Sequence, residues 1–356
     1  MPADSIIPDI PGVVVDPRLE FPLRERINRV VGQNGNSYFV SEKSDGIRLL
    51  MYCVLHENGQ QQVFLVDRKN KFSYVPQLRF PLPGQPNVWH NDTIVDGELI
   101  VDREPNGQLT TRFLAFDLLA VNGQNLIHKP FGSRLARMQQ EFINPYKKML
   151  QTANPEFRMA QPFRVSVKEM QRSYGLLKMF NEIIPQLKHG SDGLIFTSAS
   201  APYVLSTNEK MLKWKPPSEN SIDFKVALEF PANPRQPGSF DYSAKPRFML
   251  GQWEGGNNYS PFGEMFVSDE QWEQWKASNE RLQGRIVEVV FSPQVRGWTF
   301  FRFRDDKQHG NHSSVVAKVV VSIQDGVERD ELLSEMPMIR DAWKQREAQA
   351  QMQHHH

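Results

Sequence analysis

The sequence has very little cysteine and no long uninterrupted apolar run. Its one cysteine, Cys53, excludes an intramolecular disulfide and a cysteine-based zinc site. No segment approaches the ~20 consecutive apolar residues that a membrane span needs. The N-terminal stretch MPADSIIPDIPGVVVD also lacks the basic-then-apolar order of a secretory signal. These absences predict a soluble protein of a reducing compartment.

The net charge is close to zero as well, because the 356 residues include 42 Lys and Arg and 41 Asp and Glu. Taken alone, this balance argues against a polyanionic partner. The local distribution reverses that inference: residues 67–79 carry four basic side chains against Asp67, and residues 284–318 carry six against three acidic ones. Such local excesses, offset elsewhere, predict a cleft in which positive charge is focused on phosphates.

Two domains are expected at this length. Residues 38–121 contain short extended segments separated by turn signals, with hairpin turns predicted at Asp45-Gly46 and at Gly97. Residues 133–150 and 169–184 show helical spacing of apolar side chains. Hairpins followed by helices predict an α+β domain built on an antiparallel sheet.

A second, smaller domain is predicted beyond the Pro-rich stretch 231–247. Its predicted strands, with one helix inserted among them, indicate a small barrel of the oligonucleotide-binding (OB-fold) type. The strands are expected at 248–253, 284–291, 298–304 and 314–321. The predicted division is 1–230 for the first domain, 231–327 for the OB-fold domain, 328–346 for a C-terminal helix packing back, and 347–356 for a tail with tag histidines.

The segment EKSDGIR offers a candidate nucleophile. Lys43 ends a predicted strand, Asp45 and Gly46 follow, and Arg48 opens the next strand; Gly46 would let a ligand approach the backbone. An amine attacks phosphorus only when it is deprotonated, and a free lysine has a pKa of about 10.4. Nearby positive charge or desolvation is therefore needed to create the nucleophile. Alone, the segment is better explained as a solvated lysine beside an ordinary β-turn, because K-x-D-G is short and turn-like.

Six further segments follow Lys43 in order along the chain. They supply Arg68 in DRKNK, Glu98 in VDGEL, Phe116 in FLAFD, Asp192 in SDGLIF, Lys213 and Lys215 in LKWKPP, and Arg304, Asp306 and Lys307 in RFRDDK. Each also has a simple structural explanation, such as a solvated basic turn, a core phenylalanine or a charged edge strand. Their occurrence together in this order favours one site.

In this order the segments resemble the covalent nucleotidyltransferases, which comprise mRNA capping guanylyltransferases and ATP-dependent DNA and RNA ligases. The sequence most resembles fungal mRNA guanylyltransferases, through flanking stretches such as RFLAFDLLAVNGQN and LKWKPPSENSIDFK, from about Pro17 to Arg340. The resemblance implies a first nucleotidyltransferase (GTP-binding) domain. It also implies a two-step reaction, in which Lys43 attacks the α-phosphorus of GTP and the resulting lysyl-GMP passes to a 5′-diphosphate RNA end, giving the GpppN cap.

The resemblance also implies a role for each remaining candidate. Arg48 and Arg68 would contact ribose and phosphate, Glu98 would contact ribose or metal, and Asp192 would contact the α-phosphate or metal. Phe116, with Phe113 less favoured, would stack on the guanine face, and Lys168 would contact a guanine edge. Lys213 and Lys215 would contact the α-phosphate, and Asp223 follows the predicted strand that carries them. Lys213 and Lys215 would also disfavour a charged Lys43. Arg304, Asp306 and Lys307 would orient pyrophosphate when the second domain closes.

The implied cofactor is Mg²⁺ or Mn²⁺, although the sequence holds no compact ligand motif for it. The implied partners are 5′-diphosphate RNA, a separate RNA 5′-triphosphatase and the phosphorylated C-terminal repeat of RNA polymerase II, with no membrane and a nuclear location. Two alternatives stay open. One is an ATP-dependent polynucleotide ligase, which shares K-x-D-G, the paired lysines and R-x-D-K. The other is a non-catalytic RNA- or partner-binding module, for which replacing Lys43 would have no effect.

Overall fold

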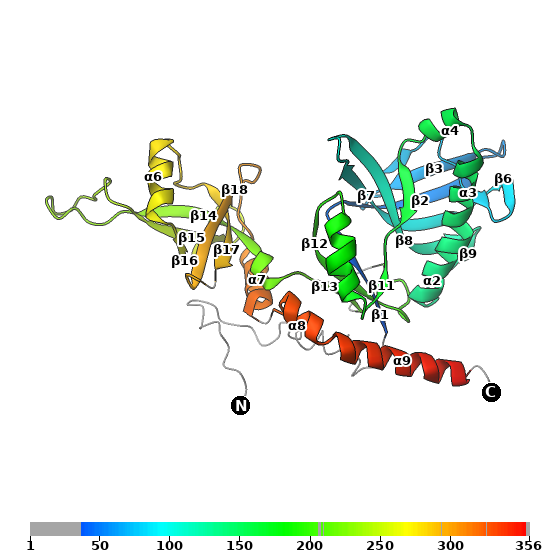
Figure 1. The fold of residues 1–356 in the computed structure, drawn as a ribbon. Coiled ribbons are helices and arrows are strands. Elements are labelled where there is room, and N and C mark those ends of the chain that lie inside the picture. Colours follow the sequence, from blue (N-terminus) through cyan, green and yellow to red (C-terminus); the bar gives the residue numbers. More distant parts are fainter. Residues whose placement is uncertain (1–36, 206–207, 209, 293, 325, 354–356) are drawn as a thin grey trace. The chain divides into compact units, whose positions relative to one another are not determined.

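The computed structural model describes residues 37–353, except for 206–207, 209, 293 and 325 (Figure 1). The chain divides into two compact units. The described residues up to Trp214, together with those from Leu332 onward, form what we call the sheet unit. Those of Lys215–Glu331 form the barrel unit. None of the described helices is long and apolar enough to cross a membrane.

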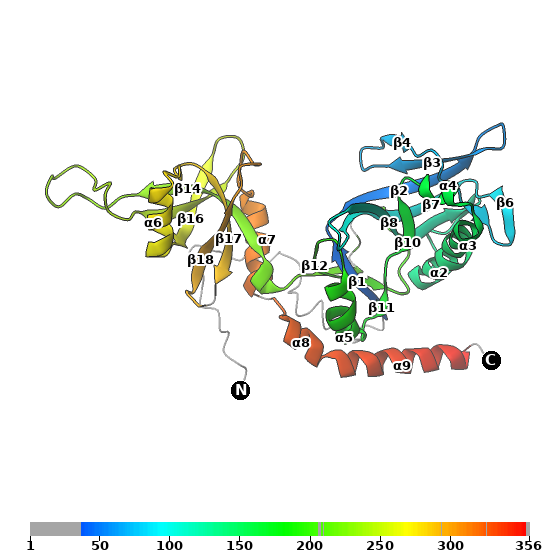
Figure 2. The ribbon, with the colours of Figure 1, turned by 45° about the horizontal axis from the view of Figure 1, so that its top comes forward.

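The sheet unit is built on two main sheets, visible edge to edge in Figure 2. The larger sheet runs β10 (Arg164–Val167), β8 (Leu109–Val121), β7 (Thr93–Arg103), β2 (Ile47–Leu55), β3 (Gln61–Val66) and β4 (Phe72–Tyr74), with β9 (Gln124–Asn125) paired to β8. The smaller sheet runs β11 (Gln171–Arg172), β1 (Tyr38–Ser44), β12 (Ser191–Ser198) and β13 (Met211–Trp214). β5 (Pro81–Leu82) and β6 (Gln85–Trp89) form a separate pair. Among the described strands of the sheet unit, all pairings are antiparallel except that of β10 with β8.

A continuous helical run covers one face of the larger sheet. It consists of α2 (Phe131–Arg137), the π-helical η2 (Met138–Ile143) and α3 (Asn144–Thr152), and α4 (Pro155–Met159) follows. This run confirms the helix predicted over 133–150. The helix predicted from residue 169 begins only at residue 176, because Gln171 and Arg172 pair with β1. It comprises α5 (Leu176–Lys178), η3 (Met179–Ile183) and η4 (Ile184–Gln186).

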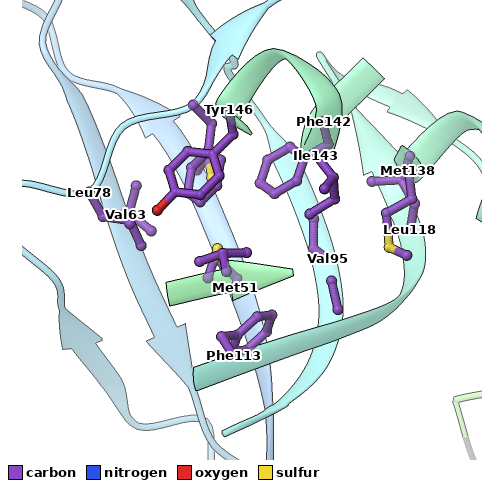
Figure 3. Packing of buried hydrophobic residues seen from close by; sticks show 14 of the residues in the cluster. Met51, Val63, Leu78, Val95, Phe113, Leu118, Met138, Phe142, Ile143 and Tyr146 are labelled. Carbon is purple, nitrogen blue, oxygen red and sulfur yellow. The ribbon is translucent and has the colours of Figure 1, made fainter. Parts of the chain in front are cut away.

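The core of the sheet unit lies between this helical run and the larger sheet (Figure 3). Phe142 stacks on Phe80 with ring centroids 4.2 Å apart. Met51 and Phe113 are fully buried on the sheet side. Each such burial contributes roughly 1.5–3 kcal/mol. Cys53 lies in the same core, where burial raises the pKa of its thiol, so it is an inert packing residue.

The K-x-D-G segment does not form the predicted hairpin. β1 belongs to the smaller sheet and β2 to the larger, so Asp45 and Gly46 carry the chain from one sheet to the other. A Cβ on Gly46 would lie 2.6 Å from Ile100 Cγ2 and 2.8 Å from the carbonyl oxygen of Leu99. Glycine is thus needed because the chain passes close against β7. This crossing sets Lys43 where the two sheets meet.

The turn predicted at Gly97 is also absent, because β7 runs without interruption through it. A Cβ on Gly97 would lie 2.3 Å from the ring of Phe113, so glycine makes room for a core side chain. The pairing of β7 with β8 shifts between Asp96 and Gly97. The second Asp-Gly of the sequence therefore marks a bulge inside a strand.

The barrel unit contains a closed five-stranded barrel, as predicted. Its strand order is β14 (Ser221–Glu229), β15 (Arg247–Trp253), β16 (Tyr259–Phe266), β18 (Gly297–Phe303) and β17 (Ile286–Ser292), with η5 (Pro217–Glu219) before it and α6 (Asp269–Ala277) between β16 and β17. The strand predicted over 314–321 is instead helix α7 (Ser313–Gln324). Val316, Val320 and Ile323 are buried there at helical spacing, which prevails over their β-branched composition.

The structure corrects two predicted boundaries: the one between the two domains and the one between the C-terminal helix and the tail. β14 pairs with β15 and β17, so the division falls between Trp214 and Lys215 and not after residue 230. The helices α8 (Arg329–Ser334) and α9 (Met336–Gln353) follow the barrel, and α9 extends through most of the predicted tail. Trp343 of α9 packs edge-on against Phe39 of β1, with centroids 5.6 Å apart, so α9 packs on the sheet unit.

Candidate active site

A β-bulge holds Lys43 against Asp192. The register of β1 and β12 pairs Glu42 with Leu194 but Ser44 with Ser191, so two residues of β12 oppose Lys43 alone. Lys43 Nζ donates a hydrogen bond to Asp192 Oδ1 in an ion pair whose side chains are 31% and 41% exposed. The third Asp-Gly of the sequence is thus a bulge and not a turn. The result is an accessible amine beside a carboxylate.

A buried lysine lies directly behind this pair. Lys168 Nζ donates to Ser44 Oγ at 2.5 Å and to Glu98 Oε2 at 3.2 Å, and its side chain is 3% exposed. The Ser44 hydroxyl donates to the same Glu98 oxygen. Lys168 also lies 3.6 Å from Glu42 Oε1. Residues far apart in sequence, Lys168 and Glu98, are thereby brought next to the strand end that carries Lys43.

Arg48 is fixed by a fully buried carboxylate. Its Nε and Nη2 donate to Asp96 Oδ1 and Oδ2 at 3.1 and 2.6 Å, and the Tyr203 hydroxyl donates to the same Oδ2 at 2.7 Å. The hydrogen bond to Asp96 raises the pKa of Arg48, while burial and Asp96 raise the pKa of Tyr203. A bidentate pair of this kind fixes orientation as well as charge.

The two candidate phenylalanines differ in exposure. Phe116 is half-buried, and the Arg48 guanidinium carbon lies 5.6 Å from its ring centroid. Phe113 is fully buried in the core against Gly97. Of the two, Phe116 is therefore the more accessible, and its role as the guanine-stacking residue stays a prediction.

The other basic candidates of the sheet unit are more scattered. Arg68 lies exposed in the turn between β3 and β4, which Asp67 stabilises by accepting backbone hydrogen bonds from Lys69 and Lys71. Lys213 is exposed on β13 opposite Ile195. β13 ends at Trp214, so Lys215 follows the strand, and the division between the units passes just before it.

The four remaining candidates form one cluster in the barrel unit. Asp223, 5% exposed, accepts hydrogen bonds from Arg304 Nη1 at 3.1 and 3.2 Å and from Lys307 Nζ. Arg304 also donates twice to Asp306 at 2.9 Å and approaches Glu288 Oε2 at 3.3 Å. The hydrogen bond from Arg304 lowers the pKa of Asp306 to about 2. These basic side chains are therefore neutralised within the barrel.

Five polar residues of the site were missed by sequence reasoning: Glu42, Ser44, Asp96, His189 and Tyr203. Glu42, Ser44 and Asp96 lie within motifs already singled out. Their closeness in sequence to Lys43 and Glu98 was the signal that could have identified them. Tyr203 carried none, because it meets Asp96 across 107 positions of sequence. Among the described residues, no group of three or more His, Cys, Asp or Glu is arranged to hold a metal ion by itself.

Comparison with known proteins gives consistent matches over both units. Residues 24–217 match the family model of the mRNA capping enzyme catalytic domain, and residues 219–333 match that of its C-terminal domain. The mRNA-capping enzyme subunit alpha of Schizosaccharomyces pombe is 44% identical, over 87% of this chain and 77% of that protein. The subunits alpha of Neurospora crassa and Candida glabrata are 38% and 40% identical, over 94% and 89% of this chain and 93% and 79% of those proteins.

Proposed function

The chain belongs to the mRNA capping enzyme family and is an mRNA guanylyltransferase that uses GTP; we propose that it works through a covalent lysyl-GMP formed on Lys43. The observation that carries this proposal is the accessible amine of Lys43, held by Asp192 at the crossing between the two sheets. A partly exposed aromatic ring, Phe116, and a fixed guanidinium, Arg48, lie on the adjoining larger sheet.

In the first step, Lys43 Nζ attacks the α-phosphorus of GTP in line with the departing pyrophosphate. A P–N bond forms, the bond from the α-phosphorus to the bridging oxygen breaks, and pyrophosphate leaves with that electron pair. An ammonium has no lone pair, so one proton must leave Nζ before the attack. Asp192 Oδ1 already accepts a hydrogen bond from Nζ, which suits it to orient the amine and to take up this proton.

In the second step, a terminal phosphate oxygen of the 5′-diphosphate RNA attacks the same phosphorus. The P–N bond breaks, Lys43 is released and regains a proton, and the GpppN cap forms. Splitting the transfer in two lets one small site handle the nucleotide and the RNA end in turn.

We propose the binding roles that the family resemblance implies. Phe116 stacks on guanine, and Lys168 donates to a guanine edge. Arg48 and Arg68 contact ribose and phosphate, and Glu98 contacts ribose. The motif residues Asp45 and Gly46, where the chain crosses between the two sheets, also contact the nucleotide. Charge on the non-bridging oxygens of the α-phosphate is stabilised by Lys213 and Lys215. Arg304 and Lys307, positioned by Asp223 and Asp306, orient the pyrophosphate leaving group.

Mg²⁺ or Mn²⁺ accompanies the triphosphate in this proposal. Asp192 and Glu98 supply carboxylate oxygens, the ligand type that these hard cations prefer, and would hold the ion together with phosphate oxygens. The bound ion would neutralise part of the triphosphate charge.

The partners are proposed from the same family. The relatives are named subunits alpha, which implies a second subunit, and we propose a separate RNA 5′-triphosphatase that supplies the 5′-diphosphate end. We also propose docking to the phosphorylated C-terminal repeat of RNA polymerase II through surface arginines and lysines, and action in the nucleus. No membrane partner is proposed.

Covalent labelling tests the central step. The protein is incubated with α-labelled GTP and Mg²⁺, denatured and separated by electrophoresis, and the labelled peptide is sequenced by mass spectrometry. We expect an acid-labile label on Lys43 that Lys43→Ala abolishes, while Lys276→Ala, an exposed lysine of α6, keeps it. Labelling by ATP alone would favour a polynucleotide ligase. Labelling that survives Lys43→Ala would overturn the role of Lys43.

A further inference from the structure

Glu42, the residue before Lys43, is a buried carboxylate shared by two cations. Its side chain is 2% exposed, and Oε1 lies 3.6 Å from Lys168 Nζ and 3.5 Å from His189 Nε2. Its other oxygen, Oε2, is buried and has no hydrogen-bond partner among the described residues. A buried carboxylate with few hydrogen bonds depends on neighbouring positive charge. Glu42 therefore relies on Lys168 and His189 together.

His189 connects the two sheets at this point. Its side chain is 8% exposed, and Nδ1 lies 2.8 Å from Asp102 Oδ1 on β7 of the larger sheet, while Nε2 faces Glu42 on β1 of the smaller one. Glu42 and then Asp102 raise the pKa of His189, although burial opposes them. Asp102 is itself paired with Arg112 of β8. The imidazole thus lies between two carboxylates, hydrogen-bonded to Asp102 through Nδ1 and 3.5 Å from Glu42 through Nε2.

The backbone around His189 is held as well. The carbonyl oxygen of Lys188 accepts from the Arg103 amide at 2.8 Å, and that of Gly190 accepts from the Asp45 amide at 2.9 Å. β12 begins at the next residue and reaches its bulge at Asp192. The segment that presents Asp192 to Lys43 is therefore anchored three residues earlier.

We propose that His189 is a positioning residue for guanylyl transfer, acting through Glu42 on Lys168. This inference rests on the proposed function, in which Lys168 reads a guanine edge. Without the imidazole, Glu42 keeps Lys168 as its one cationic partner and draws Nζ away from Ser44 and Glu98. The lysine then no longer meets the 6-oxo group of the base, so discrimination between guanine and adenine nucleotides falls.

His189→Gln tests the proposal, because glutamine keeps a hydrogen-bonding side chain of similar reach without the charge. Covalent adduct formation is measured with GTP and with ATP as a function of nucleotide concentration. We expect the KM for GTP to rise about tenfold, with a smaller change in kcat, and the GTP-to-ATP preference to fall by a similar factor. Glu42→Gln removes the carboxylate that would draw Lys168 away, so combining it with His189→Gln should restore the wild-type KM and base preference.

His56→Gln is the matched control, since His56 is exposed in the turn between β2 and β3. Lys43→Ala is measured alongside: if it still forms an adduct, the proposed function itself fails. If Lys43→Ala is inactive but His189→Gln keeps the wild-type KM and base preference, only the positioning role is overturned. Should His189→Gln fail to fold, His189→Asn is measured in its place, and a wild-type KM and base preference in that variant overturn the proposal.

Discussion

Lys43 of the sheet unit and the candidate cations of the barrel unit are paired with carboxylates that differ in burial. In the sheet unit, Lys43 meets Asp192 in a pair in which both side chains are about a third exposed, at 31% and 41%. In the barrel unit, Arg304 and Lys307 converge on Asp223, which is 5% exposed, and Arg304 has two further carboxylate partners. Lys43 thus depends on a partly exposed carboxylate, whereas Arg304 and Lys307, 15% and 36% exposed, share a buried one.

This difference separates reactivity from stability. An exposed ion pair contributes between about 0 and 1 kcal/mol, so Lys43 can leave Asp192 for a nucleotide at little cost. Removing one partner from a buried cluster is far more expensive, because it leaves an uncompensated charge. For Arg304 and Lys307 to act on pyrophosphate, phosphate oxygens must replace part of their interaction with Asp223.

The largest expected effect comes from exchanging one carboxylate in each unit. Asp223→Asn removes the buried anion shared by Arg304 and Lys307 and should lower the free energy of unfolding by about 3 kcal/mol. Asp192→Asn should change it by less than about 1 kcal/mol while reducing covalent adduct formation. Urea unfolding of the full chain and the labelling assay measure the two quantities.

Asp305→Asn serves as the control in the barrel unit, because Asp305 is 70% exposed in its pair with Arg285. It should resemble Asp192→Asn in stability. Equal destabilisation by Asp192→Asn and Asp223→Asn would break the distinction between the two units.

A smaller effect is expected from one aromatic exchange in each unit. Phe116→Leu removes the stacking surface and should raise the KM for GTP about tenfold, which corresponds to about 1.4 kcal/mol. Phe266→Leu, at a 52% exposed phenylalanine of the barrel, should leave that KM unchanged. Adduct formation against GTP concentration provides the measurement. Equal KM values for the two variants would remove Phe116 from the guanine site.

The smallest effect is a pH dependence of opposite sign in the two units. The pKa of His189 is raised on folding, so its stabilisation is complete below its ordinary pKa of about 6.5 and is lost as pH rises through the raised value. The pKa of Asp306 is lowered to about 2, so its stabilisation is present above about 3.9 and is lost as pH falls toward 2.

Thermal unfolding measured over a range of pH tests both of these pH dependences. The Tm difference between the wild type and His189→Gln should shrink at alkaline pH, and that between the wild type and Asp306→Asn should shrink at acid pH. If both differences shrank on the same side of neutrality, the assignment of these charges to their partners would be wrong.

The sequence predicts the local elements of this fold better than their connections. The helix expected over 133–150 is present as the run over 131–152, because its signal lies in the spacing of neighbouring residues. The segment at Asp45 and Gly46 was misread, since a hairpin turn and a crossing between sheets have the same local composition. Only the distant pairing of β2 with β7 distinguishes the two.

The residues of the candidate site also differ in how far the sequence predicts them. Lys43 and Asp192 were singled out by motifs, and the bulge in β12 brings them together. His189 and Tyr203 escaped notice because their roles depend on carboxylates 87 and 107 positions away. Single residues of common type at such separations leave no pattern in one sequence.

The order of the elements along the chain has a consequence for synthesis. The sheet unit is interrupted after Trp214 by the whole barrel and resumes at Leu332, and Trp343 covers Phe39 of the first strand. A ribosome therefore releases the strand that carries Lys43 long before the helix that covers it. Since chains emerge at about 5–20 residues per second, Phe39 stays uncovered for many seconds, while the barrel has all its strands in time to fold first. The nucleophile therefore belongs to the unit that is completed last.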